Sequence, residues 1–280
     1  MKFVIRAGGI GTRLWPYSRR DRPKQFHAFV GGRSMIQKAV ARIVSLAGPD
    51  DLYVSTGKET VTAVREHLPD LSEAHLFEEP AVRDTGPAVG LESVLLETRY
   101  PGCTVASLGS DHHIGKPDEF CRLLQVAETA LEEMPETLIT IGVKPTRIDT
   151  GLGYIKKGER LRTILDEPVF AVEGFTEKPD DDLARAYVKS GDYLWNSNMF
   201  VWKARTILDL FSRFEPEIYD ILMRIQREAE RGDASEVIAS EYPKMKEVPI
   251  DNAILERAQS LATLEADIDW SDIGTWGALA

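Results

Sequence analysis

Short apolar segments alternate with amphipathic segments through the first half of the chain. The apolar segments are residues 3–5, 52–55, 74–77, 103–108 and 138–143, and the helix-like segments are 34–47, 59–68, 87–98 and 117–133. The helix at 34–47 shows both end signals, because Ser34 can cap its start and Gly48-Pro49 ends it. Regular alternation of this kind predicts an α/β fold in which helices cover both faces of a mainly parallel sheet.

The second half has a different pattern. Extended segments at 154–157, 169–174 and 198–202 precede helices at 204–211 and 216–231. We interpret this region as an insertion that builds the second wall of a cleft. No linker rich in Gly, Pro or Ser separates the halves, so we expect one domain over residues 1–280 that divides near residue 145.

Composition narrows the function classes. The chain has 280 residues and a net charge of −11, which disfavours general binding to nucleic acid or to anionic membranes. Two cysteines are too few for a disulfide framework or a cysteine-rich zinc site. The apolar start is interrupted by Arg6, and no apolar run is long enough to span a membrane. We therefore expect a cytoplasmic protein that binds neither nucleic acid nor membrane.

A glycine loop follows the first predicted strand. It reads Gly8-Gly9-Ile10-Gly11-Thr12-Arg13, and glycines allow backbone N–H groups to converge on phosphate oxygens. It lacks the Gly-Lys-Ser/Thr of a P-loop, and Leu14 stands where a dinucleotide fingerprint needs glycine. A tight turn beside a solvated basic stretch is the alternative. Arg13 suits bidentate phosphate contact and Lys24 can add a point charge, so phosphate binding is favoured.

Carboxyl ends of parallel strands meet at one edge of a sheet, where ligands bind. The glycine loop and Ser110-Asp111-His112-His113 both follow predicted strands, so both should face one cleft. Mg²⁺ commonly binds one or two carboxylates together with substrate phosphates. Asp111 is a candidate ligand, although a role as a helix cap or turn residue is the simpler reading. His112 and His113 are interpreted first as loop residues.

The glycine loop, Trp15-Pro16 and Pro23-Lys24-Gln25-Phe26 together resemble the signature of the sugar-nucleotide pyrophosphorylases, and within them the mannose-1-phosphate guanylyltransferases (GDP-mannose pyrophosphorylases). The similarity continues in order along nearly the whole chain. The further similar segments are 79–80, 83–88, 110–112, 142–155, 175–179, 195–197, 250–251 and 270–276.

The resemblance implies a Rossmann-like mixed, mainly parallel sheet flanked by helices, the nucleotide-diphospho-sugar transferase fold. It implies that about 1–145 form a nucleotide-binding half and about 146–280 a sugar-phosphate-binding half. The implied reaction is guanylyl transfer from GTP to α-D-mannose 1-phosphate, which gives GDP-mannose and pyrophosphate. The implied cofactor is Mg²⁺, held by Asp111 together with Asp272.

The resemblance also assigns roles to individual residues. Implied catalytic residues are Arg13, Lys24, Asp111 and Lys178, and implied substrate-binding residues are Gly8, Gly9, Gly11, Thr12, Arg83, Asp84, Thr85, Gly153, Glu177, Asn196 and Asp251. Without the resemblance, Asp272 reads as a turn residue, Glu177-Lys178 as a solvated turn, and Asp251 as a helix N-cap.

Several positions depart from the family pattern. Arg6 stands where an apolar strand residue is usual, and Asp84, Gly86, Leu152 and Asn198 also differ. Asp84 and Asn198 leave two alternatives open: a uridylyl- or thymidylyltransferase for another hexose 1-phosphate, and a catalytically inactive subunit that binds a nucleotide sugar. The chain ends soon after Trp276, whereas the resemblance implies a further C-terminal segment. We expect a homodimer.

Overall fold

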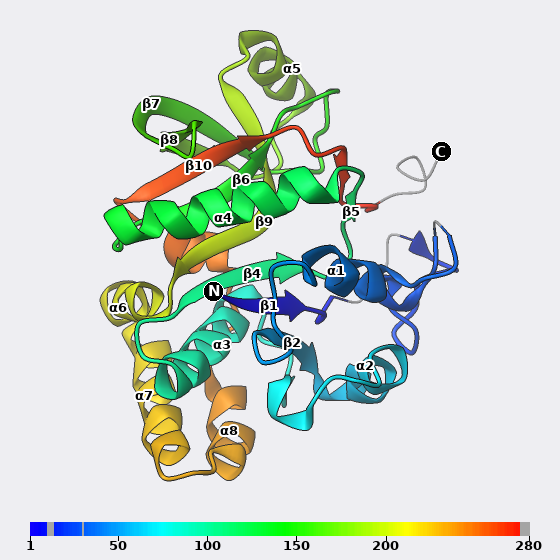
Figure 1. Ribbon diagram of the computed structural model, residues 1–280, viewed down its shortest axis with the longest axis vertical. Helices are drawn as coiled ribbons and strands as arrows, with labels where there is room; N and C mark the ends of the chain where they lie inside the picture. Colours follow the sequence, from blue (N-terminus) through cyan, green and yellow to red (C-terminus); the bar gives the residue numbers. More distant parts are fainter. Residues whose placement is uncertain (10–13, 30, 275–280) are drawn as a thin grey trace.

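The computed structural model describes residues 1–9, 14–29 and 31–274 (Figure 1). Nine strands form one sheet in the order β3-β2-β1-β4-β9-β6-β10-β8-β7. Their bounds are β1 Lys2–Arg6, β2 Leu52–Gly57, β3 Leu76–Glu79, β4 Thr104–Gly109, β6 Leu138–Val143, β7 Tyr154–Ile164, β8 Glu167–Thr176, β9 Tyr193–Lys203 and β10 Leu261–Ala266. The predicted mixed, mainly parallel α/β sheet is confirmed: β3, β2, β1 and β4 are parallel neighbours, and antiparallel pairs occur in the rest of the sheet.

The second half of the chain extends this same sheet. Strand β9 lies antiparallel between β4 and β6, and β10 pairs parallel to β6. The sequence pattern was interpreted as an insertion, and the structure places its strands β7, β8 and β9 in the main sheet. The pairing of β9 with strands about 50 to 100 residues earlier is a long-range contact that local sequence pattern does not encode.

Strands β7 and β8 form a long hairpin that the sequence pattern underestimated. The predicted segments 154–157 and 169–174 are the inner parts of strands joined by a tight turn at Leu165-Asp166. Both turn residues have positive φ, 49° and 65°, as a two-residue type I′ hairpin turn requires. The pair Leu165-Asp166 differs from the Asn-Gly pair that is usual in such turns, which explains why the sequence predicted only a polar connection.

Helices cover both faces of the sheet (Figure 1). On one face lie α1 (Met35–Ile43) and α4 (Pro117–Glu133), packed on alternate side chains of β1 such as Phe3 and Ile5. On the other face lie α3 (Thr85–Arg99), α6 (Ala204–Phe214) and α7 (Pro216–Glu230), around Val4. The remaining helices are α2 Val61–His67, α5 Asp181–Ser190, α8 Ser235–Glu241 and a π-helical turn at Asp251–Leu255.

Helix ends agree with the capping residues of the sequence. Ser34 caps α1 in a capping box with Gln37, and Pro117 opens α4 at the predicted position. Helix α3 begins at Thr85, two residues before the expected Pro87, because the Asp84 carboxylate accepts a hydrogen bond from the Thr85 N–H. The predicted strand at 74–77 starts only at Leu76, after a 3₁₀ turn.

A two-stranded sheet lies beside the carboxyl end of β4. Strand β5 (His113–Ile114) pairs antiparallel with β11 (Trp270–Ser271). This pairing carries the end of the described chain back to the segment that follows β4. Within residues 1–9, 14–29 and 31–274, no helix combines the length and apolar character needed to cross a membrane.

Candidate active site

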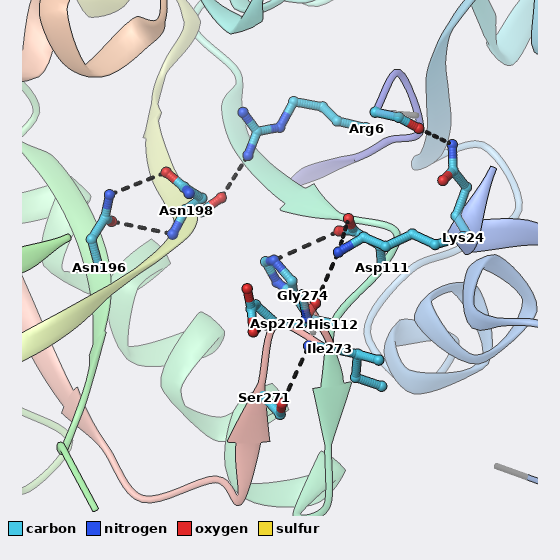
Figure 2. Close-up of polar contacts among 12 residues, drawn as sticks. Arg6, Lys24, Asp111, His112, Asn196, Asn198, Ser271, Asp272, Ile273 and Gly274 are labelled. Atoms are coloured by element: carbon cyan, nitrogen blue, oxygen red, sulfur yellow. Dashed lines mark hydrogen bonds and ion pairs between the residues drawn. The ribbon is translucent and has the colours of Figure 1, made fainter. Parts of the chain in front are cut away.

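Lys24 contacts both Asp111 and Asp272, the two residues that only the resemblance had paired (Figure 2). Its Nζ lies 2.9 Å from Asp111 Oδ2 and donates a hydrogen bond of 2.9 Å to the Asp272 main-chain oxygen. Asp111 follows β4, and Asp272 follows β11, so the β5–β11 pairing brings the two residues to one place. The structure thus places three predicted site residues together.

The charge state of this cluster follows from burial and from its neighbours. Burial would raise the pKa of Asp111, but the positive charge of Lys24 and the interaction with His112 outweigh it and lower the pKa. Asp111 is therefore ionised at neutral pH. Burial lowers the pKa of His112 to about 4, so its imidazole is neutral. That ring packs edge-on against Trp270 at 5.5 Å.

The donor set suits a hard divalent cation. Two aspartates supply oxygen ligands, and Mg²⁺ commonly takes one or two carboxylates together with substrate phosphate oxygens. In the described part of the chain, no group of three or more His, Cys, Asp or Glu side chains could hold a metal by itself. Asp111 and Asp272 offer the kind of oxygen donor that such a cation takes.

Gln25, which was not predicted as part of the site, forms hydrogen bonds to the start of the glycine loop. Gln25 Nε2 donates to the main-chain oxygens of Ala7 and Gly9, at 2.7 and 2.9 Å. A Cβ on Gly8 would lie 3.7 Å from Glu79 Oε1. Gln25 lies in the Pro23-Lys24-Gln25-Phe26 segment that carried the resemblance, which was the available signal. Gly11, Thr12 and Arg13 lie outside the described residues.

Four predicted sugar-side residues meet across β7, β8, β9 and the π-helical turn. Asn196 donates its main-chain N–H to the Gly153 oxygen at 2.8 Å and its side-chain Nδ2 to Asp251 Oδ1 at 3.1 Å. A Cβ on Gly153 would lie 2.7 Å from Glu177 Oε2 and 3.4 Å from Asn196 Cβ. A side chain at residue 153 would displace the Glu177 carboxylate, so Gly153, Glu177, Asn196 and Asp251 lie close together.

Asp251 has a different role from a helix cap. Ile250 occupies the N-cap position, and the Asp251 carboxylate instead accepts from Asn196, so the N-cap interpretation was wrong. Burial, followed by the nearby charge of Glu177, raises the pKa of Asp251 to about 6. The side chain therefore changes charge within the range where enzymes are commonly assayed.

Two other predicted groups have partners within the protein. Lys178 has a φ of 45° and forms an ion pair with its neighbour Glu177 at the surface. Arg83 donates to the Pro243 and Val82 main-chain oxygens. Thr85 Oγ1 accepts from the Ile250 N–H at 2.9 Å. Contacts of Lys178 with a sugar phosphate, and of 83–85 with a nucleotide, stay predictions.

Comparisons with known proteins identify the family of the chain. Residues 2–280 match the nucleotidyl transferase family. The chain is 34% identical to the mannose-1-phosphate guanylyltransferase of Klebsiella pneumoniae, over 99% of this chain and 58% of that protein. It is 34% identical to the alginate biosynthesis protein AlgA of Pseudomonas syringae pv. tomato, over 99% of this chain and 57% of that protein. The chain thus spans somewhat more than half the length of these curated relatives.

A solved structure shows the same fold. The crystal structure titled mannose-1-phosphate geranyltransferase, from Thermus thermophilus, superposes with a TM-score of 0.87 at 29% sequence identity. The match covers 99% of this chain and 77% of that one. The family match, the shared fold and the Lys24–Asp111–Asp272 cluster lead to one conclusion: the chain belongs to the nucleotidyl transferase family.

Proposed function

We propose that the chain transfers a guanylyl group from GTP to α-D-mannose 1-phosphate. The observation that carries the proposal is the position of Lys24 between Asp111 and Asp272. A sugar-side edge formed by Gly153, Asn196 and Asp251 occupies the other half of the fold. The names of the curated relatives supply the choice of guanine and mannose.

The reaction needs positioning and charge neutralisation more than proton transfer. A phosphate oxygen of mannose 1-phosphate attacks the α-phosphorus of GTP. A new P–O bond forms, the bond to the β-phosphate oxygen breaks, and pyrophosphate leaves. The attacking oxygen is already anionic, so no general base is required. The protein must instead hold two polyanions together.

The cationic groups divide this task. Lys24, nearly buried at the centre of the site, would neutralise the triphosphate, and Arg13 would grip it bidentately. Lys178 would contact the sugar phosphate after leaving its ion pair with Glu177. Asp111 and Asp272 would hold Mg²⁺, which when bound neutralises charge on the α-phosphate.

The carboxylate and amide groups of the sugar edge suit hydroxyl recognition. Glu177 and Asp251 offer acceptors, and Asn196 Oδ1 can accept one further hydrogen bond, since both N–H groups of its Nδ2 already donate within the protein. Segment 83–85 lies at the start of α3, where we place the nucleotide base. We further propose a cytoplasmic homodimer, for which light scattering after size exclusion gives the oligomeric state.

A substrate panel tests the proposal. Pyrophosphate release is measured with GTP, UTP and dTTP, each combined with mannose 1-phosphate or glucose 1-phosphate, in Mg²⁺. The expected result is a kcat/KM that is highest for GTP with mannose 1-phosphate and is lost in Asp111→Asn. Preference for UTP or dTTP would reassign the base. Binding of GDP-mannose without turnover would instead indicate an inactive subunit.

A further inference from the structure

Arg6 links the two halves of the molecule. It is the last residue of β1, and its Nη2 donates a 2.5 Å hydrogen bond to the main-chain oxygen of Asn198 on β9 (Figure 2). Strand β4 lies between these strands in the sheet, so the side chain crosses over the end of β4. An apolar residue at this position could not make this contact.

The acceptor of this hydrogen bond belongs to a constrained segment. Asn198 has a φ of 54°, a conformation that non-glycine residues adopt at a cost and keep only when their surroundings hold them. Its side-chain Oδ1 accepts from Asn196 Nδ2, and its N–H donates to Asn196 Oδ1, both at 3.1 Å. Asn198 therefore orients the Asn196 amide through both of that amide's polar atoms.

The same amide reaches the sugar edge. Asn196 Nδ2 also donates to Asp251 Oδ1 at 3.1 Å. A continuous series of hydrogen bonds thus runs from Arg6 through Asn198 and Asn196 to Asp251. A change at Arg6 is transmitted to the sugar edge through groups whose orientations depend on one another.

Two buried acidic side chains lie near the Arg6 guanidinium. Glu92 on α3 and Glu79 on β3 are both buried, and Arg6 lowers the pKa of each against the raising effect of burial. The Nε of Arg6 is also buried, and it has no hydrogen-bond partner among the described residues. The Arg6 side chain is therefore partly buried, with its Nε enclosed and its Nη2 bonded to the Asn198 main-chain oxygen.

We propose that Arg6 is a positioning residue for sugar-phosphate binding. It fixes the Asn198 carbonyl and thereby holds the Asn196 amide in the orientation that meets the sugar hydroxyls. The inference rests on the proposed function for the identity of the substrate. It accounts for a charged residue at a position where the resemblance implies an apolar one.

Steady-state kinetics of three variants test the proposal. Arg6→Leu removes the hydrogen bond, and Arg6→Lys keeps the charge but loses the planar fork. Arg99→Leu is the matched control, because Arg99 Nη1 also donates to a main-chain oxygen, that of Ala74, at the far end of α3. Arg6→Leu is expected to raise KM for mannose 1-phosphate about tenfold, as for loss of a charge-assisted hydrogen bond. KM for GTP should change little, Arg6→Lys should restore part of the loss, and Arg99→Leu should match the wild type.

A substrate-free measurement separates this proposal from the proposed function. Hydrogen–deuterium exchange of the full chain is followed in peptides that cover residues 194–199 and 250–255. Both Arg6 variants are expected to exchange faster there, and Arg99→Leu is not. If the wild type shows no guanylyl transfer, the proposed function fails while exchange still tests the role of Arg6.

Unchanged exchange in these peptides together with an unchanged KM for mannose 1-phosphate would overturn the assignment of Arg6. An equal rise in both KM values would do the same, because it would indicate a general structural defect. If Arg6→Leu does not fold, Arg6→Lys alone decides by the same two measurements.

Discussion

Lys24 has two kinds of partner, a carboxylate and a main-chain carbonyl, and both come from distant segments. Its ammonium group lies where the charges of Asp111 and of a bound triphosphate would compete for it. A cation in such a buried position contributes more to phosphate binding than one at the surface, because the local dielectric is lower. The residue therefore offers the sharpest single test of the site.

Lys24→Met is expected to lower kcat/KM by roughly 10²–10³-fold, as for removal of one preorganised charge-stabilising group. Lys2→Met is the matched control, since Lys2 Nζ also contacts a carboxylate, that of Asp51, and a carbonyl, that of Asp50, at the opposite end of β1. Its kcat/KM should stay within about twofold of the wild type, as for an ordinary peripheral ion pair. An equal loss of kcat/KM in the two variants, measured by pyrophosphate release, would show that Lys24 is not part of the site.

The raised pKa of Asp251 predicts that kcat/KM depends on pH. Its pKa is raised to about 6, so the carboxylate is ionised above pH 6 and protonated below it. As the pH falls below 6, kcat/KM for the sugar phosphate should decrease, because the protonated group is a weaker acceptor for hydroxyls. The phosphate monoester itself titrates near pH 6, so Asp251→Asn serves as the reference profile. Parallel profiles for the two proteins would contradict this role.

At the scale of single elements, the start of α3 is attached to the segment that leads into the π-helical turn. The Gly86 N–H donates to the Val248 oxygen at 2.9 Å, and the Val248 N–H donates to the Arg83 oxygen at 3.3 Å. Thr85 adds its contact with Ile250. The position of Asp251 thus depends on the start of helix α3.

Gly86→Ala should break this attachment. The added Cβ would lie 2.6 Å from the Val248 main-chain oxygen, and a backbone atom cannot move aside as easily as a side chain. We expect the free energy of unfolding in urea to fall by about 1–3 kcal/mol. Gly57→Ala, whose Cβ would meet only Thr60 Oγ1 at 4.0 Å, should cost less than about 1 kcal/mol. Equal stability of the two variants would show that the contact is not tight in solution.

Local signals in the sequence predicted many elements well. The bounds of α4 and β6 match their expected residues, because Pro117 marks the helix start and Leu138–Val143 is an uninterrupted apolar run. Leu165-Asp166 was missed because its turn geometry is carried by residues that rarely adopt it.

At the scale of the whole molecule, one continuous sheet carries the predicted site residues of both halves of the chain. Asp111 and Asp272, and likewise Asn196 and Asp251, meet only through pairings between strands far apart in sequence. Motifs could name these residues by resemblance, but no spacing could pair them. Arg6 and Asn198 were both recognisable as departures from the pattern, but the hydrogen bond between them was not.

The buried acid Glu92 predicts how the stability of the whole molecule changes with pH. Burial raises its pKa to about 8, against the lowering effect of Arg6. A carboxyl whose pKa is higher in the folded state contributes full stability below its unfolded value, near 4, and loses it as pH rises through 8. Its hydrogen-bond donor is Ser107, at 2.5 Å.

Glu92→Gln removes this titration while keeping the shape of the side chain. At pH 8 the free energy of unfolding of the variant should be about 1–3 kcal/mol higher than that of the wild type. At pH 5 this difference in stability should be smaller. Urea denaturation at both pH values measures this difference. A variant less stable than the wild type at pH 8 would mean that Glu92 is ionised and paired with Arg6.

The most direct test of guanylyl transfer is to follow both products at once. Phosphorus NMR of the full chain with GTP, mannose 1-phosphate and Mg²⁺ should show GDP-mannose and pyrophosphate appearing in equal amounts. It should also show GTP and mannose 1-phosphate re-forming when the products are supplied instead. Persistence of both substrates with active, folded protein, or release of inorganic phosphate without GDP-mannose, would contradict the assignment.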